Sequence, residues 1–159
     1  MYKALLSLLV CSCMSSSAMI AQPDDFSTIA YENTIPFVLP ITRGKVIKVY
    51  DGDTITIAAK LPYPESPVYR VSVRLNGIDT PEIKGQTQRE KELAKQIRDI
   101  LQSKIMNKMV ELKNTSNEKY GRLLADVYLD DICINDWMIE QGYAVKYDGG
   151  TKIRPESWM

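Results

Sequence analysis

Apolar residues at alternate positions dominate the middle of the chain, a pattern typical of β-strands with one buried face. The first two such runs flank Asp51-Gly52, which predicts a hairpin. Extended segments are expected at 46–49, 54–57, 68–78, 110–112, 123–129 and 143–147. Loops or turns are expected between them at 61–67, 114–119 and 130–131.

One longer segment, 87–109, has apolar residues three and four positions apart and predicts an amphipathic α-helix. A short helix is expected to be capped by Asn135, to run to Gln141 and to end at Gly142. This order of elements predicts a mainly β fold with some α: a five-stranded OB-type barrel with one long and one short helix. The open face of such a barrel commonly holds oligonucleotides.

The N-terminal residues have the order of a secretory signal peptide. Lys3 is the only charge in residues 1–18, and an apolar run and then small residues follow it. That run is too short to span a bilayer, so no transmembrane segment is expected. We expect an exported protein, secreted or periplasmic, cleaved after Ala18 or alternatively after Ala21. A lipid-anchored form, attached through one of the two cysteines of this segment, is the minor alternative.

The remaining chain is expected to hold one domain, because 159 residues suit one ordinary domain rather than two. We expect a leader at 19–43, which contains three prolines, the barrel domain at 44–147 and a tail at 148–159. Cys133 would be alone after removal of the signal, so no intrachain disulfide is expected. A monomer without an obligate protein partner is expected.

The amino-acid composition excludes some kinds of catalytic and metal site but adds nothing to the prediction of the fold. The chain has 20 basic and 20 acidic residues, so its net charge gives no support to nucleic-acid binding. It has no histidine, which excludes a histidine base, a histidine nucleophile and histidine-ligated zinc. The carboxylates that remain favour hard cations such as calcium or magnesium.

Four short motifs carry the candidate chemistry, and each alone has an ordinary structural interpretation as a turn, a strand end or a paired arginine. They are Asp51-Gly52-Asp53-Thr54, Asp79-Thr80-Pro81-Glu82 preceded by Arg74, Lys119-Tyr120-Gly121-Arg122, and Gln141-Gly142-Tyr143-Ala144. Taken together, two carboxylates and a backbone carbonyl form a weak hard-cation site, and two arginines clamp a phosphate. A further carboxylate can activate water, which completes the groups needed for metal-assisted phosphodiester hydrolysis.

In this order, between residues 44 and 144, the motifs resemble those of the staphylococcal-nuclease (thermonuclease) family. The resemblance implies an OB-type barrel and an enzyme that hydrolyses DNA and RNA, leaving 3′-phosphate ends. It also implies a calcium ion held by the carboxylates of Asp53 and Asp79 and by the Thr80 carbonyl. Asp51 would lie behind these ligands and support them.

The resemblance also implies the catalytic roles. Glu82 would act as the general base on the attacking water. Arg74 and Arg122 would bind the phosphate and stabilise the transition state. Lys119 and Tyr120 match positions that contact a nucleotide phosphate in the family.

The chain departs from the family pattern in two places. The loop at 61–67 is longer, and a surface loop tolerates such an insertion. After Ala144, where family members carry base-stacking tyrosines and a third helix, Tyr147 is followed by Asp148-Gly149-Gly150. The sequence therefore assigns no base-stacking residue.

The sequence thus favours an exported, calcium-dependent endonuclease acting on DNA or RNA. One alternative is a non-catalytic OB-type module that binds nucleic acid, and another is a surface lipoprotein with calcium as a structural staple. Glu82 together with Arg74 and Arg122 favours the enzyme, because a binding module needs no base beside two phosphate clamps. Millimolar extracellular calcium would fill a site whose dissociation constant is about 10⁻⁴–10⁻³ M.

Overall fold

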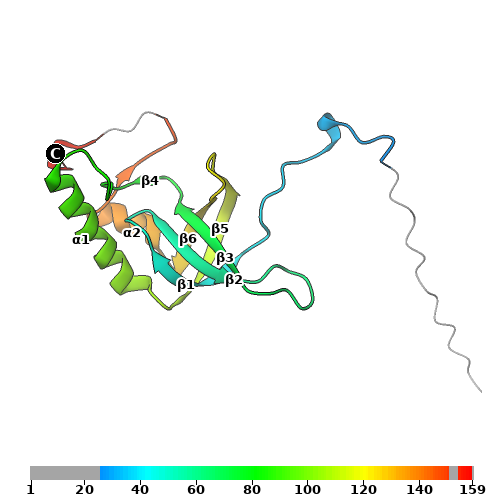
Figure 1. Cartoon of the computed structure of the whole chain (residues 1–159), viewed down its shortest axis with the longest axis horizontal. Helices are drawn as coiled ribbons and strands as arrows, with labels where there is room; N and C mark the ends of the chain where they lie inside the picture. The colour runs from blue at the N-terminus through cyan, green and yellow to red at the C-terminus, as the bar shows by residue number, and fades with distance from the viewer. Residues whose placement is uncertain (1–25, 151–153, 159) are drawn as a thin grey trace, which may run out of the picture. The chain divides into compact units, whose positions relative to one another are not determined.

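The computed structural model describes residues 26–150 and 154–158, so the signal peptide expected at 1–18 lies outside the described residues. The chain divides into two units, 1–36 and 37–159. The described part of the first unit contains a 3-10 turn, η1 (Tyr31–Asn33), and exposes the side chains of Tyr31 and Ile35. The second unit contains the barrel (Figure 1).

In the described part of the second unit, five strands form a closed barrel, which confirms the predicted OB-type fold. They are β1 (Arg43–Val49), β2 (Thr54–Ala59), β3 (Tyr69–Leu75), β5 (Met109–Asn117) and β6 (Leu123–Leu129). The pairs β1–β2, β2–β3, β1–β5 and β5–β6 are antiparallel, whereas β3 and β6 pair in parallel and close the barrel. Three shorter strands are β4 (Ile78–Asp79), which pairs with β8 (Val145–Lys146), and β7 (Ile132–Cys133), which pairs with β6.

Alternation along each strand builds the core. In β6, Leu123, Ala125, Val127 and Leu129 are buried, and the residues between them are only partly buried. The long helix α1 (Gln88–Ile105) adds residues three and four positions apart, such as Leu101, which is fully buried. Burial of one such leucine contributes roughly 1.5–3 kcal/mol. The interior of the barrel and one face of α1 therefore form a single apolar core.

Both helices differ in detail from the prediction. α1 ends at Ile105, before the predicted limit of 109, because Asn107 has a left-handed backbone (φ +63°) and β5 starts two residues later. The short helix α2 (Ile134–Glu140) is present, but Cys133, not Asn135, is its N-cap residue. Asn135 is instead buried and accepts a hydrogen bond from the Val127 N–H at 2.9 Å, because the backbone of a buried strand needs a partner.

Several of the predicted extended segments were wrong in their limits, and for two of them the backbone shows the reason. The single strand predicted at 68–78 is broken after Leu75, because Gly77 has φ +73° and turns the chain into β4. The strand predicted at 110–112 continues to Asn117 as β5, and an irregularity between Lys113 and Ser116 accommodates the polar residues that had indicated a turn at 114–119. The reversal into β6 lies after Asn117.

The topology brings the chemical motifs to one end of the barrel. The turn between β1 and β2, the end of β3 and the segment after β4 all lie there. The turn between β5 and β6 joins them. Among the described residues, no helix is both long enough and apolar enough to cross a membrane.

Candidate active site

A cavity of about 320 Å³ opens at this end of the barrel. Eight of the nine predicted site residues line it: Asp51, Asp53, Arg74, Thr80, Glu82, Lys119, Tyr120 and Arg122. The ninth, Asp79, contacts Arg74 from the side of a neighbouring cavity. Residues that are distant in sequence are thus brought to one place.

Arg74 is at the centre of the cluster and is buried. Its guanidinium forms ion pairs with the Asp53 carboxylate and with Asp79 Oδ1, the latter at 3.3 Å, and donates to the Ile78 carbonyl at 3.1 Å. Burial by itself would lower the pKa of Arg74, but the two carboxylates outweigh it and raise that pKa above its ordinary value. The guanidinium is therefore a permanent charge held in a fixed position.

Arg122 is held by a second set of contacts. Its Nη1 donates to the Thr54 hydroxyl at 3.2 Å, and its Nε lies 3.3 Å from Glu118 Oε2. Thr54 in turn donates to Asp53 Oδ1 at 2.9 Å. Burial by itself would raise the pKa of Glu118, but hydrogen bonds from Arg122 and from the Tyr120 N–H lower it. Both arginines thus face the cavity with their orientation fixed by carboxylates or by a hydroxyl.

Asp51 adds a third carboxylate to this end of the barrel. It is partly buried and accepts a hydrogen bond from the Asp53 N–H at 3.2 Å. Burial, and then the neighbouring Asp53 carboxylate, raise the pKa of Asp51 from its ordinary 3.8 to about 7. Burial beside a second carboxylate thus favours the protonated form of Asp51.

The oxygen donors around Asp53 are of the chemical kind that hard cations prefer. The carboxylates of Asp53 and Asp79 both contact Arg74, and Thr80, which follows Asp79, is buried beside them. Within residues 26–150 and 154–158, no group of three or more Cys, Asp or Glu side chains is placed so that it could hold a metal ion. A cation held by two carboxylates and a backbone carbonyl would need water molecules to complete its coordination.

Glu82 lies on a loop that wraps around a buried glutamate, Glu90. The Glu90 carboxylate accepts hydrogen bonds from the Gln86 N–H at 2.9 Å and from the Glu82 N–H at 3.5 Å. A Cβ atom added at Gly85 would lie 2.3 Å from the Glu90 Cδ, so any larger residue there would force the Glu90 carboxylate to shift. The position of Glu82 is therefore set from the first turn of α1.

Lys119 and Tyr120 lie on the exposed rim of the cavity. The Lys119 ammonium is 5.0 Å from the centroid of the Tyr120 ring, and the Arg122 Cζ is 5.9 Å from the same centroid. The ring thus lies close to one exposed cation and one partly buried cation. This arrangement presents positive charge to a ligand entering from solvent.

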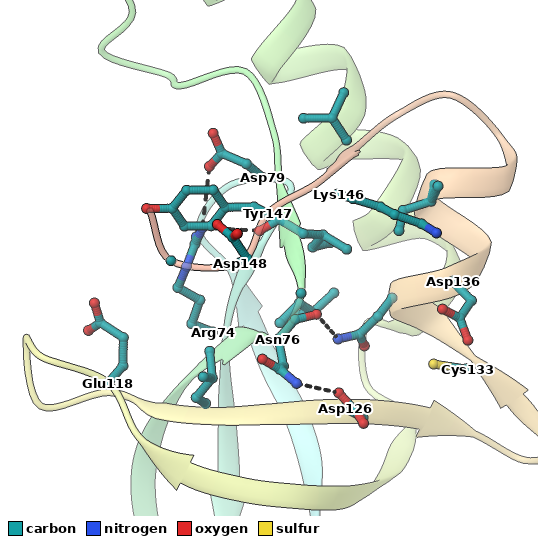
Figure 2. Close-up of a pocket in the computed structure, with 18 of the residues that line it drawn as sticks. Arg74, Asn76, Asp79, Glu118, Asp126, Cys133, Asp136, Lys146, Tyr147 and Asp148 are labelled. Atoms are coloured by element: carbon teal, nitrogen blue, oxygen red, sulfur yellow. Dashed lines mark hydrogen bonds and ion pairs between the residues drawn. The ribbon is translucent and has the colours of Figure 1, made fainter. Parts of the chain in front are cut away.

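A second cavity of about 860 Å³ adjoins the first and shares Arg74, Glu118, Lys119 and Tyr147 with it. Figure 2 shows the Tyr147 ring beside the linked pair Arg74 and Asp79, with Asp126 and Asp136 toward the other end. The centroid of the Tyr147 ring is 5.9 Å from the Arg74 Cζ, and β8, which ends one residue before, fixes this placement by pairing with β4.

Sequence reasoning missed four residues of the site: Thr54, Glu90, Glu118 and Tyr147. Thr54 is the last residue of the first motif, but the sequence assigned it no role. Glu118 was not included although it directly precedes Lys119. Glu90 stands three residues after Thr87, the spacing of a capping box, and this spacing could have indicated a buried role. Tyr147 was recognised only as a departure from the family pattern.

Comparisons with known proteins agree with this geometry. A protein-family model described as staphylococcal nuclease homologue matches residues 72–156. An uncharacterized protein of Bacillus anthracis is 33% identical over 110 residues, which is 67% of this chain and 48% of that protein. An uncharacterized endonuclease of Escherichia coli O157:H7 is 28% identical over 114 residues, which is 71% of this chain and 66% of that protein.

The thermonuclease of Staphylococcus hyicus is 31% identical over 102 residues, which is 63% of this chain and 56% of that enzyme. The chain therefore spans about half to two thirds of the length of these relatives. The family model, by contrast, covers more than half of this chain and includes Arg74, Asp79, Glu82 and Arg122. The chain belongs to the family of staphylococcal nuclease homologues.

Proposed function

We propose that this protein is an exported, calcium-dependent endonuclease that hydrolyses phosphodiester bonds in DNA or RNA and leaves 3′-phosphate ends. The observation that carries the proposal is the cavity in which Arg74, Arg122 and Glu82 meet beside the carboxylate of Asp53. Family membership and the nuclease names of two relatives support hydrolysis as the reaction.

The two arginines would bind the scissile phosphate. Each is already oriented by acidic partners, Arg74 by Asp53 and Asp79 and Arg122 by Glu118. Guanidinium groups match phosphate oxygens in geometry, and preorganised positive charge stabilises the charge that develops when the phosphorus becomes five-coordinate. Lys119 and Tyr120 on the rim would contact an adjoining phosphate.

Glu82 would take the proton from the attacking water. A carboxylate suits this role in a chain without histidine, and the loop around Glu90 would hold it in place. A 3′-phosphate product requires that water adds to phosphorus while the bond to the 5′ oxygen breaks. The leaving 5′ oxygen then gains a proton, so the net reaction consumes one water and gives a 3′-phosphate and a 5′-hydroxyl.

The carboxylates of Asp53 and Asp79 and the Thr80 carbonyl would hold the calcium ion, with Asp51 behind them. When bound, calcium neutralises charge on the phosphate and makes a coordinated water easier to deprotonate. Export would place this site in millimolar calcium, which is sufficient for a weak site. The expected signal peptide and the expected metal thus support the same proposal.

The test is cleavage of denatured DNA by the purified protein in calcium or in chelator, with a Glu82→Gln variant alongside. We expect cutting in calcium, no cutting in chelator, and loss of cutting in the variant. End analysis of the products would show 3′-phosphates. If the folded wild-type protein does not cut, the non-catalytic nucleic-acid-binding module becomes the better description.

A further inference from the structure

Three strands of the barrel carry positive charge without any negative charge. β1 (Arg43–Val49), β2 (Thr54–Ala59) and β3 (Tyr69–Leu75) together contain five Lys or Arg residues and no Asp or Glu. The whole chain, in contrast, has equal numbers of the two kinds. This side of the barrel is therefore charged differently from the molecule as a whole.

The strand register places the charged side chains in rows on one face. Lys45, Ala58 and Arg70 are neighbours across the three strands and form one row. Lys48, Thr56 and Ser72 form the next row, and Thr54 and Arg74 form the row at the active site. Rows two residues apart are separated by about 7 Å. Lys45, Lys48 and Arg70, with the small residues Thr56, Ala58 and Ser72, are called the basic wall below.

The cations of the basic wall are available to a ligand. Lys45, Lys48 and Arg70 are exposed, and none has an ion pair with any residue that the structure describes. Arg43 is not included in the basic wall because its cross-strand neighbour in β5 is the acidic residue Glu111. The side chains between the cations are small, so they leave room for a polymer backbone to approach.

The basic wall is continuous with the candidate active site. Along β3, Arg70, Ser72 and Arg74 lie on the same face because side chains two residues apart point the same way. On β1, the Lys48 ammonium is 5.7 Å from the centroid of the Tyr50 ring, and Tyr50 lines the site cavity. Two strands thus lead from the basic wall to the residues that would bind the scissile phosphate.

We propose that the basic wall binds the phosphates of a single-stranded nucleic acid whose scissile phosphate lies between Arg74 and Arg122. This proposal rests on the proposed nuclease function and adds a binding surface outside the active-site cavity. OB-type barrels bind oligonucleotides on the face of their second and third strands, and cations that follow the backbone supply most of the affinity. A membrane surface is disfavoured, because the basic wall has no large apolar side chain to insert.

The test compares a long and a short substrate in one variant. Lys45→Gln, Lys48→Gln and Arg70→Gln are combined, and a control variant combines Arg89→Gln, Lys91→Gln and Lys95→Gln, which removes equal charge from α1. We expect the KM for a DNA strand of about 20 nucleotides to rise on the order of tenfold, with kcat unchanged. Cleavage of a dinucleotide, which reaches only the cavity, should not change. The control should match the wild-type protein on both substrates.

Binding of the same labelled strand in chelator gives a readout independent of cutting. Loss of three phosphate contacts should reduce the slope of log affinity against log salt by about 2. An unchanged slope and unchanged KM in a folded variant would overturn the basic wall as a binding surface while leaving the nuclease proposal intact. If the triple variant no longer binds phosphatidylglycerol vesicles but still binds the DNA strand, the basic wall is a membrane-binding surface and the proposal is overturned.

Failure of the nuclease proposal would look different. If the wild-type protein binds the strand in a salt-dependent way but never cuts it, the proposed nuclease activity is ruled out. Loss of that binding in the triple variant would still support the basic wall as a binding surface. Thermal unfolding of each variant shows that the fold is kept. The single Arg70→Gln variant provides a milder second measurement, with a slope reduced by about 0.7.

Discussion

Arg122 donates a hydrogen bond from its Nη1 to the hydroxyl of Thr54 at 3.2 Å, across 68 positions of the sequence. Thr54 donates in turn to Asp53, and Asp53 is ion-paired with Arg74. The two guanidiniums that would bind the phosphate are therefore connected through one hydroxyl and one carboxylate. A change at Thr54 should act on both.

Thr54→Val should lower kcat/KM by on the order of tenfold, because Arg122 loses an acceptor and Asp53 loses a donor while side-chain volume is kept. Steady-state cleavage of denatured DNA measures the effect. Thr42→Val, at an exposed position, is the matched control and should behave as wild type. Wild-type kinetics in Thr54→Val would show that Arg122 is positioned without this bond.

Arg122→Ala should reduce the rate by on the order of 10²–10³, the cost of removing one preorganised group that stabilises developing charge. The effect should appear in kcat, since the charge develops in the transition state. Single-turnover cleavage separates this step from product release. Activity near that of the wild-type protein would remove Arg122 from the catalytic machinery.

Asp53→Asn should weaken calcium binding by on the order of tenfold or more, because calcium affinity follows the number of charged ligands. The amide keeps the shape of the carboxylate and Asp79 still pairs with Arg74, so the barrel should stay folded, although with lower stability. Calcium titration of activity measures the change, and Asp99→Asn on the exposed side of α1 is the control. Chelator should abolish wild-type activity yet barely change the melting temperature, whereas unfolding in chelator would support calcium as a structural staple.

Glu90→Gln should destabilise the protein by about 1–3 kcal/mol, because the new amide group would face N–H donors that the carboxylate now accepts from. It should also lower kcat, since the loop that positions Glu82 loosens. Urea unfolding and cleavage kinetics measure the two effects. Glu92→Gln, at an exposed position on the same helix, should change neither.

Asp51 predicts a pH dependence of stability in the calcium-free protein. Its folded-state pKa of about 7 lies above its ordinary 3.8, so the folded state holds the proton more tightly. Wild-type stability should therefore fall as the pH rises from about 4 to 7. The Asp51→Asn variant has no carboxyl group to titrate at this position, so its stability should not fall in this way. The unfolding free energy of the variant minus that of the wild-type protein should therefore increase by on the order of 1–3 kcal/mol between pH 5 and pH 8. An advantage independent of pH would contradict the shift.

The sequence predicted the barrel well where alternation was strong and uninterrupted. The limits of β6 agree with the prediction because its apolar residues alternate without a break. The predicted strand at 68–78 was too long, although its pattern contained the signal: Val71, Val73 and Leu75 are in phase, and Ile78 is not. A change of phase at an Asn-Gly pair marks the turn into β4.

The site was predictable where residues belong to contiguous motifs and not where they act through distant contacts. Thr54 and Arg122 come together only in the folded barrel, and no local sequence pattern predicts the hydrogen bond between them. Asn135 has the local features of a helix cap, yet it satisfies the backbone of β6 and the carbonyl of Asn76. At such positions, the need of buried backbone groups for hydrogen-bond partners outweighs the preference of a residue for a local role such as helix capping.

The parallel pairing of β3 with β6 has a consequence for when activity arises. In that pairing Arg74 lies opposite Leu124, and Arg122 directly precedes β6, so the two guanidiniums approach each other only when the barrel closes. Closure joins segments separated by α1 and β5, and contacts so distant in sequence form late and slowly during folding. A chain whose barrel has not closed would therefore contain both arginines but could not yet bind a phosphate between them.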